Sequence, residues 1–311
     1  MDSLSDRLIF AWWNTGLSPP GGRPRDTDHD FQVAANIVKV LLQEYQVDFL
    51  GLGEVTKFDL DRLTNDIRPS HYSLYDGTLK EGRLQFDTGA IFNLDCFKLI
   101  DHFETIERHG LRQLKLANRV DLMASGDSQS FHVYITHWPS HLVPDSESLR
   151  IHLGSRLRSA LAKVLATDGG DARVILMGDF NEEPFHECLD GQLLATRDRS
   201  IALKSEGYLY NPFWRFLGES QPYSHLDPHP SFAGTCYVAS GNRTKWKTVD
   251  QIIVSSTFLG RSSWHLNEHF TRIIHPPFPN TALSLSGAIF DHFPVIMAIE
   301  KFTSDQGGSH A

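Results

Sequence analysis

Short apolar runs alternate with longer amphipathic segments along this chain, and few folds accommodate that order. Between the runs, apolar residues recur every three or four positions at 30–46 and 147–166, which predicts two amphipathic helices. Helices that alternate with strands indicate an α/β domain, because the helices bury the faces of the sheets. The runs that are typical of buried strands lie at 7–13, 48–55, 88–93, 131–137, 173–178, 249–255 and 294–299.

The chain is long enough to bury a core of useful size, with 311 residues of which 41% are hydrophobic and 22% charged. We expect one domain over residues 1–303, followed by a disordered tail at 304–311. No run approaches the ~20 apolar residues that a membrane span needs. The first residues, MDSLSDRLIF, are acidic and lack the pattern of a secretory signal.

Cysteine usage favours a reducing compartment. Cys96, Cys188 and Cys236 are odd in number and scattered, which is not typical of a disulfide framework or of a thiolate metal site. We therefore expect a cytoplasmic location.

The charge balance limits the classes of partner. The net charge is -9 and the isoelectric point about 5.9, whereas proteins that grip nucleic acid by its phosphates are usually basic. Acidity of the whole surface leaves room for a local basic groove. Clustered carboxylates that bind a metal would themselves add negative charge.

Polar residues stand at the ends of the predicted strands. Each one alone has a structural explanation, as a turn residue, a cap, an ion pair or a hydrogen-bonded core histidine. Together they indicate one site, because ligand sites are commonly built at strand ends. These residues are Asn14, Glu54, His137, Asp179, Asn181, Asp250, Asp291 and His292.

This set of side chains suits the hydrolysis of a phosphate ester. Hard oxygen ligands bind Mg²⁺ or Mn²⁺, which offsets charge in an in-line displacement at phosphorus. A histidine paired with an aspartate is held in one tautomer and made more basic. A remaining aspartate can orient or deprotonate the attacking water.

The same residues lie in motifs whose order resembles the endonuclease/exonuclease/phosphatase superfamily over nearly the whole chain. That group contains pancreatic-type DNase, exonuclease III, inositol polyphosphate 5-phosphatases and neutral sphingomyelinases, and the HWPS form is common among bacterial members. The resemblance implies a four-layered α/β sandwich, in which two mixed β-sheets pack face to face with helices outside. The motifs are WN at 13–14, GE at 53–54, HWPS at 137–140, GDFN at 178–181, VDQIIVS at 249–255 and DHFP at 291–294.

The resemblance also implies a role for each residue. Asn14, Glu54 and Asp291 resemble residues on the metal side, with Glu54 as the principal ligand. Among the catalytic residues, His137 is similar to the histidine that contacts the scissile phosphate, Asp179 to the aspartate that activates water, Asn181 to the phosphate-binding asparagine, and Asp250 to the acid that pairs with His292. Arg119 and Arg150 resemble basic residues on the substrate side.

Two positions depart from the family's pattern. Gly16 stands where enzymes like exonuclease III carry an aspartate, which argues against an abasic-site endonuclease. Thr136 stands where many members have an asparagine. The long irregular segment 182–246 is rich in aromatic residues, which we interpret as packing of an insertion; a substrate-contacting rim is the alternative.

The leading hypothesis is a nuclease that depends on Mg²⁺ or Mn²⁺ and cleaves phosphodiester bonds in nucleic acid. A phosphatase or phosphodiesterase that acts on a small-molecule or lipid phosphate is the alternative, and the acidic charge favours it. A catalytically inactive binding module of the same fold is the third reading, and the intact set of site residues argues against it.

Overall fold

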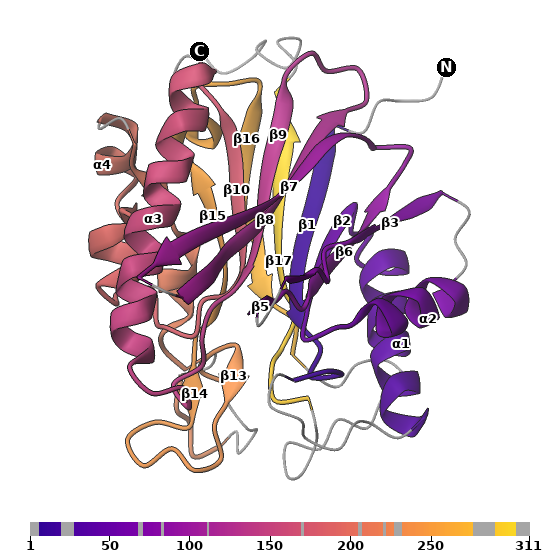
Figure 1. The fold of residues 1–311 in the computed structure, drawn as a ribbon, viewed down its shortest axis with the longest axis vertical. Helices are drawn as coiled ribbons and strands as arrows, with labels where there is room; N and C mark the ends of the chain where they lie inside the picture. The colour runs from indigo at the N-terminus through magenta and orange to yellow at the C-terminus, as the bar shows by residue number, and fades with distance from the viewer. Residues whose placement is uncertain are drawn as a thin grey trace.

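Two large β-sheets pack face to face and carry helices on their outer faces, as the computed structural model shows (Figure 1). This arrangement confirms the α/β sandwich of two mixed sheets with helices outside. The structure describes residues 6–19, 28–67, 71–81, 84–110, 112–168, 171–204, 207–219, 222–226, 232–275 and 290–302.

The first sheet has six strands in the order β16-β17-β1-β2-β6-β3. Its β1 and β2 are parallel, and its other neighbouring strands are antiparallel, so the sheet is mixed. Its strands are β1 (Arg7–Asn14), β2 (Phe49–Gly53), β3 (Tyr72–Asp76), β6 (Thr88–Asn93), β16 (Trp264–Ile273) and β17 (Val295–Lys301).

The second sheet has seven strands in the order β11-β12-β15-β10-β9-β8-β7. Here β9 and β10 are parallel, as are β11 and β12. Its strands are β7 (Phe97–His109), β8 (Arg112–Ala124), β9 (Ser130–His137), β10 (Arg173–Asp179), β11 (Ala195–Thr196), β12 (Leu209–Tyr210) and β15 (Asp250–Ser255). Two small hairpins join β4 (Lys80–Glu81) to β5 (Leu84–Gln85), and β13 (Cys236–Tyr237) to β14 (Trp246–Lys247).

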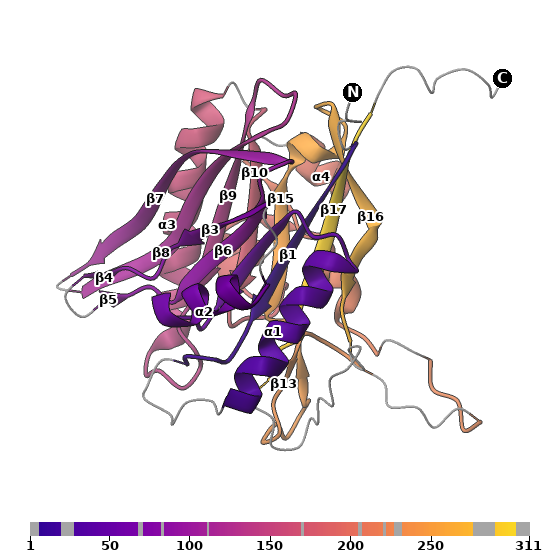
Figure 2. The same ribbon diagram turned by 90° about the vertical axis from the view of Figure 1, so that its right-hand side faces the viewer.

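Helices complete the outer layers. Figure 2 shows α1 (Asp28–Gln43) and α2 (Lys57–Ile67) over the six-stranded sheet. Helix α3 (Ser146–Thr167) covers the other sheet and is followed in the chain by the short α4 (Arg199–Lys204). The remaining helical turns are η1 (Cys188–Gln192), η2 (Pro212–Phe216) and η3 (Ser256–Leu259). No helix among the described residues is long and apolar enough to cross a bilayer.

Three apolar layers hold the sandwich together. Phe10, Phe131 and Met177 belong to the core between the two sheets. Leu41 belongs to the core under α1, and Leu157 to the core under α3. Fully burying one such side chain contributes roughly 1.5–3 kcal/mol, so these layers supply most of the drive to fold.

The structure confirms the predicted strands and both predicted helices to within a few residues, and it adds elements that the sequence pattern did not predict. The additions include α2, the long hairpin of β7 and β8, and the edge strand β16. The expected tail at 304–311 lies outside the described residues. The expectation of one domain over 1–303 stays a prediction.

Candidate active site

The site residues gather because the strand registers bring strand ends together. In the first sheet Asn14, the last residue of β1, pairs with Gly53 at the end of β2, and Glu54 follows directly. In the second sheet Asp179 pairs with His137 on one side and with Asp250 on the other. The two sheets therefore present carboxylates and imidazoles at the same end of the sandwich.

Asn14 joins the two sheets. Its side-chain Nδ2 donates to Glu54 Oε1 at 3.3 Å and to Asp179 Oδ2 at 3.2 Å. Its Oδ1 accepts from the backbone N–H of Gly16 at 3.2 Å. Gly16 has a φ of 63°, a conformation that glycine adopts at no steric cost. This conformation presents the Gly16 N–H to Asn14 Oδ1 and so helps to orient the Asn14 side chain.

His292 forms the first imidazole–carboxylate pair. Its Nδ1 lies 2.8 Å from Asp250 Oδ2 and 3.8 Å from Asp179 Oδ2. The other oxygen of Asp250 accepts from Trp12 Nε1 at 2.8 Å, which fixes the carboxylate from the opposite sheet. Burial favours a lower pKa for His292, but the Asp250 carboxylate outweighs it and raises the pKa well above the ordinary value.

His137 forms a second pair with a residue that the sequence pattern did not point to. Its Nδ1 lies 2.7 Å from Asp87 Oδ2, and its Nε2 lies 3.9 Å from both Glu54 Oε1 and Asp179 Oδ2. Burial works against charge on both partners, but His137 and Lys115 lower the pKa of Asp87, while Asp87 raises that of His137. Lys115 Nζ donates to the second oxygen of Asp87. The sequence feature that could have pointed to Asp87 is its position, because this acidic residue directly precedes strand β6.

Two carboxylates, Glu54 and Asp179, lie buried together at the centre of the site, where a bound cation would offset their charge. Burial raises the pKa of Glu54, and burial together with the nearby Asp250 raises that of Asp179. Both accept from the same Asn14 amide, so their oxygens lie close together. An all-oxygen set with excess buried negative charge fits a hard divalent cation such as Mg²⁺ or Mn²⁺.

The turn after β10 is shaped to present Asp179. Asn181 has a φ of 54°, an uncommon conformation for a residue other than glycine, and its backbone N–H donates to Asp179 Oδ1 at 2.8 Å. Its side-chain Nδ2 donates to the carbonyl of Trp138 at 2.9 Å. A Cβ atom on Gly178 would lie 2.0 Å from the carbonyl oxygen of Thr136, so β9 and β10 can approach only with glycine there.

Three expected site residues lie apart from this centre. Arg119 pairs with Tyr134 on the face of the second sheet that packs against α3, where it forms a two-pronged ion pair with Asp121. Arg150 is buried within α3 and donates to the carbonyl of Pro139 at 2.6 Å; its guanidinium also bonds Glu182. Asp291 is 56% exposed in its side chain and lies beside Nε2 of His292, at 3.9 Å.

These positions have simple causes. Side chains alternate between the faces of a strand, so Arg119 points away from the face that carries the site. Arg150 ties the loop after β9 to the loop after β10 from behind, and has no exposed surface with which to meet a substrate.

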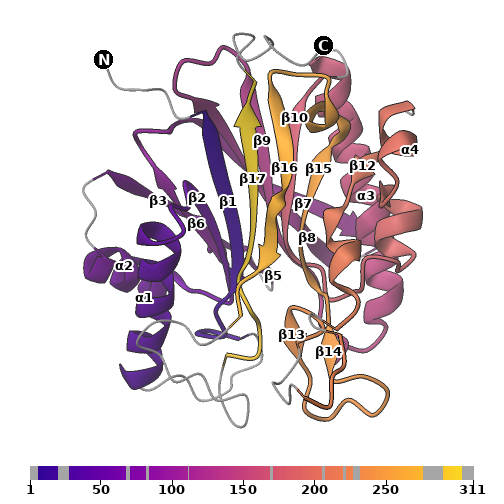
Figure 3. The same cartoon turned by 180° about the vertical axis from the view of Figure 1, so that it is seen from behind.

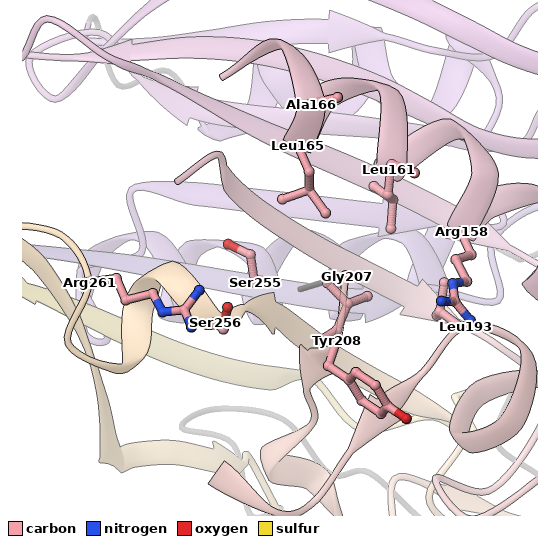
Figure 4. Close-up of a pocket in the computed structure, with 12 residues that line it drawn as sticks. Arg158, Leu161, Leu165, Ala166, Leu193, Gly207, Tyr208, Ser255, Ser256 and Arg261 are labelled. Carbon is pink, nitrogen blue, oxygen red and sulfur yellow. The ribbon is translucent and has the colours of Figure 1, made fainter. Parts of the chain in front are cut away.

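A separate hollow lies on the α3 side of the molecule (Figure 4). It has a volume of about 460 Å³ and is lined by α3, β12 and the end of β15, with Arg158 and Arg261 at its sides. Among the described residues, its lining contains no carboxylate and no imidazole, so those residues offer no group for metal-assisted hydrolysis.

A sequence model described as the Endonuclease/Exonuclease/phosphatase family matches residues 28–301. The chain belongs to the endonuclease/exonuclease/phosphatase family. The family is one of phosphoester hydrolases, and its name covers both nucleases and phosphatases. No curated protein matches the sequence.

Solved structures with the fold of this family are distant in sequence. The human Nocturnin catalytic domain with bound sulfate anion is 17% identical, with a TM-score of 0.60 and 96% of each chain covered. A mannosyl-6-phosphatase from Bacteroides thetaiotaomicron is 14% identical, with a TM-score of 0.59, covering 94% of this chain and 99% of that one. TDP2 from D. rerio, complexed with single-strand DNA product, is 16% identical, with a TM-score of 0.56, covering 96% of this chain and 100% of the other. These likenesses support the fold.

Proposed function

We propose that the chain is a hydrolase that depends on Mg²⁺ or Mn²⁺ and cleaves phosphodiester bonds in nucleic acid. The observation that carries the proposal is the pair of imidazole–carboxylate dyads on either side of Asp179. Two polarised imidazoles around one buried carboxylate suit a reaction that must bind a phosphoryl oxygen and activate water.

The metal would be held by the carboxylate oxygens of Glu54 and Asp179, which converge because both accept from the Nδ2 group of Asn14. When bound, it would offset negative charge on the phosphate and polarise the phosphorus–oxygen bonds. Asp291, which we expected on the metal side, is left out of this set because its carboxylate lies beside the imidazole of His292.

The side chains would share the remaining work. Asp250 holds Nδ1 of His292 and leaves its Nε2 to donate a proton or a hydrogen bond to a phosphoryl oxygen. Asp87 holds Nδ1 of His137 in the same way, so its Nε2 faces the centre. Asp179 would orient the attacking water and accept its proton.

The rim of the site favours a long polyanion. The hairpin of β13 and β14 lies beside the site, because the backbone N–H of Tyr237 donates to the carbonyl of Asp291 at 2.8 Å (Figure 3). Arg243 and Lys245 are exposed in its turn, and Lys247 follows in β14. Cations next to a phosphoesterase centre suit phosphates that flank the scissile one, despite the net charge of -9.

A phosphatase that acts on small phosphorylated molecules is the second candidate. The acidic net charge favours it, and a solved structure of the same fold is a mannosyl-6-phosphatase. The cytoplasmic location expected from the cysteines stays a prediction.

The first test incubates the purified chain with single- and double-stranded DNA and RNA, with Mg²⁺, with Mn²⁺ and with chelator. Asp179→Asn and His292→Ala should each lower the rate by a factor of about 10²–10⁴. Asp121→Asn serves as the matched control. Asp121 Oδ1 lies 2.8 Å from His132 Nδ1 in a buried pair that is remote from the site.

The outcomes separate the three readings. Cleavage that persists in chelator, or in both site variants, would contradict the mechanism. Turnover of sugar or inositol phosphates without cleavage of nucleic acid would favour the phosphatase. Calorimetry that finds phosphate binding coupled to metal, without turnover of any substrate, would favour the inactive binding module.

A further inference from the structure

A second cluster of potential metal ligands adjoins the site, shares His292 with it and adds Cys236 and Asp291, which the chemistry above does not use. Ligand atoms of Cys236, Asp291 and His292 all lie within 4.8 Å of one another. Two segments that are distant in sequence hold them together, through a β-bridge between Cys236 and His292. The bridge fixes the backbone positions of Cys236 and His292 relative to one another.

His292 presents the right nitrogen to this cluster. Its Nδ1 is occupied by Asp250, which leaves Nε2 facing Asp291 Oδ1 at 3.9 Å. A histidine that ligates a metal commonly has its other nitrogen hydrogen-bonded to a carboxylate, as His292 has. The imidazole is thus oriented for a cation on its outer side.

The Cys236 thiol determines which cation this cluster would prefer. Mg²⁺ and Mn²⁺ prefer oxygen ligands, whereas a thiolate, an imidazole and a carboxylate together suit Zn²⁺. Bonds of roughly 2.0–2.3 Å place tetrahedral ligand atoms about 3.4–3.6 Å apart. The 3.9 Å between Asp291 and His292 must therefore shorten only slightly, and the Asp291 side chain, 56% exposed, is free to turn.

We propose that Cys236, Asp291 and His292 form an inhibitory Zn²⁺ site, with water in the fourth position. On binding, the S–H bond of Cys236 breaks, its proton passes to solvent, and a sulfur–zinc bond forms. Zinc on Nε2 of His292 removes the group that would donate to the phosphoryl oxygen. The regulatory part of this inference rests on the proposed function; the binding part does not.

The binding test uses the full chain with Co²⁺ as a spectroscopic substitute for Zn²⁺. A thiolate ligand gives a sulfur-to-cobalt charge-transfer band in the near ultraviolet, which the wild type should show. Cys236→Ser should lose that band and bind Zn²⁺ at least about 10-fold more weakly in competition with a chromogenic chelator. Cys96→Ser is the matched control, because Cys96 bonds Asp48 before β2, at the opposite end of that strand from Glu54.

The activity test adds Zn²⁺ against a fixed excess of Mg²⁺ and normalises each variant to its own zinc-free rate. Inhibition should be reversed by chelator, retained in Cys96→Ser and relieved in Cys236→Ser. A missing charge-transfer band, or a zinc affinity that Cys236→Ser leaves unchanged, would overturn the site. Zinc that binds through Cys236 without inhibiting would overturn its regulatory role. If no substrate is found, the proposed function fails while the cobalt spectrum still decides the site.

Discussion

Replacing Asp250 with asparagine changes two hydrogen bonds with almost no change in volume. The buried carboxylate accepts from Trp12 Nε1 through one oxygen and faces His292 Nδ1 through the other, each at 2.8 Å. In Asp250→Asn the single remaining oxygen serves one partner only. If it accepts from Trp12, the new NH₂ group faces His292 Nδ1, which must then act as an acceptor and stay neutral.

The loss should be large and should fall on kcat. Asp250 raises the pKa of His292 well above its ordinary value, so the wild-type imidazole keeps its proton at neutral pH. Without that carboxylate the imidazole can stabilise charge on a phosphoryl oxygen only weakly. The loss of positioned acid–base help costs a factor of about 10²–10⁴, or roughly 2.7–5.5 kcal/mol of transition-state stabilisation.

The assay is the pH dependence of kcat for cleavage of a short oligonucleotide with saturating Mg²⁺. Activity should fall as pH rises through the pKa of His292, so this basic limb should move to lower pH or be lost in Asp250→Asn, where the Asp250 carboxylate no longer offsets the effect of burial. Asp121→Asn, in the remote pair with His132, should leave the profile in place. A kcat of Asp250→Asn within about threefold of wild type would refute the reasoning, because a factor of 10²–10⁴ is expected.

Three further predictions concern the frame around the site. Arg150→Ala should lower the free energy of unfolding by about 3–5 kcal/mol in urea titration, because it removes both guanidinium bonds to the buried Glu182 carboxylate; a change below 1 kcal/mol would contradict it. Gly178→Ala should lower the melting temperature and the rate together, since its Cβ would lie 2.0 Å from the Thr136 carbonyl oxygen; a variant as stable as wild type would show that β9 and β10 can separate cheaply. Burial raises the pKa of Glu54, so its carboxylate should take up a proton at a pH above the ordinary value near ~4.3. Mg²⁺ affinity, measured by calorimetry at several pH values, should therefore begin to fall before the pH reaches that value. An affinity that holds to lower pH would contradict this.

The sequence pattern predicted the strands that are buried on both faces and missed those that are exposed on one. Residues 8–13 form a continuous apolar run because β1 lies between α1 and the other sheet. Strand β7 alternates only at its start, as in Phe97-Lys98, and residues 101–104 are all exposed, so it lacks a continuous buried run. Strand β16 lies at the edge of its sheet and is mostly half-buried, which weakens its pattern further.

The candidate site could be predicted as far as strand ends defined it. The position of Asn14, Asp179 and Asp250 at strand ends was enough to predict them as site residues. The pairing of His137 with Asp87 depends on how β6 and β9 lie in space, which the sequence pattern does not show. The prediction for Arg119 rests on its resemblance to a basic residue on the substrate side, which does not tell on which face of the strand its side chain lies. The alternation of side chains along β8 places Asn118, not Arg119, towards the interior, where its Nδ2 bonds Thr88 Oγ1 at 2.8 Å.

The pairing of β1 with β17 places Arg7 and Glu300 at the end of the sandwich opposite the candidate site. These antiparallel strands set Arg7 opposite Glu300, and the two side chains form an ion pair at 2.7 Å. Asn14 ends the same strand, about 23 Å away at ~3.3 Å per residue. A surface tether joined near Arg7 or Glu300 would therefore leave the end of the sandwich that carries the candidate site facing the solution.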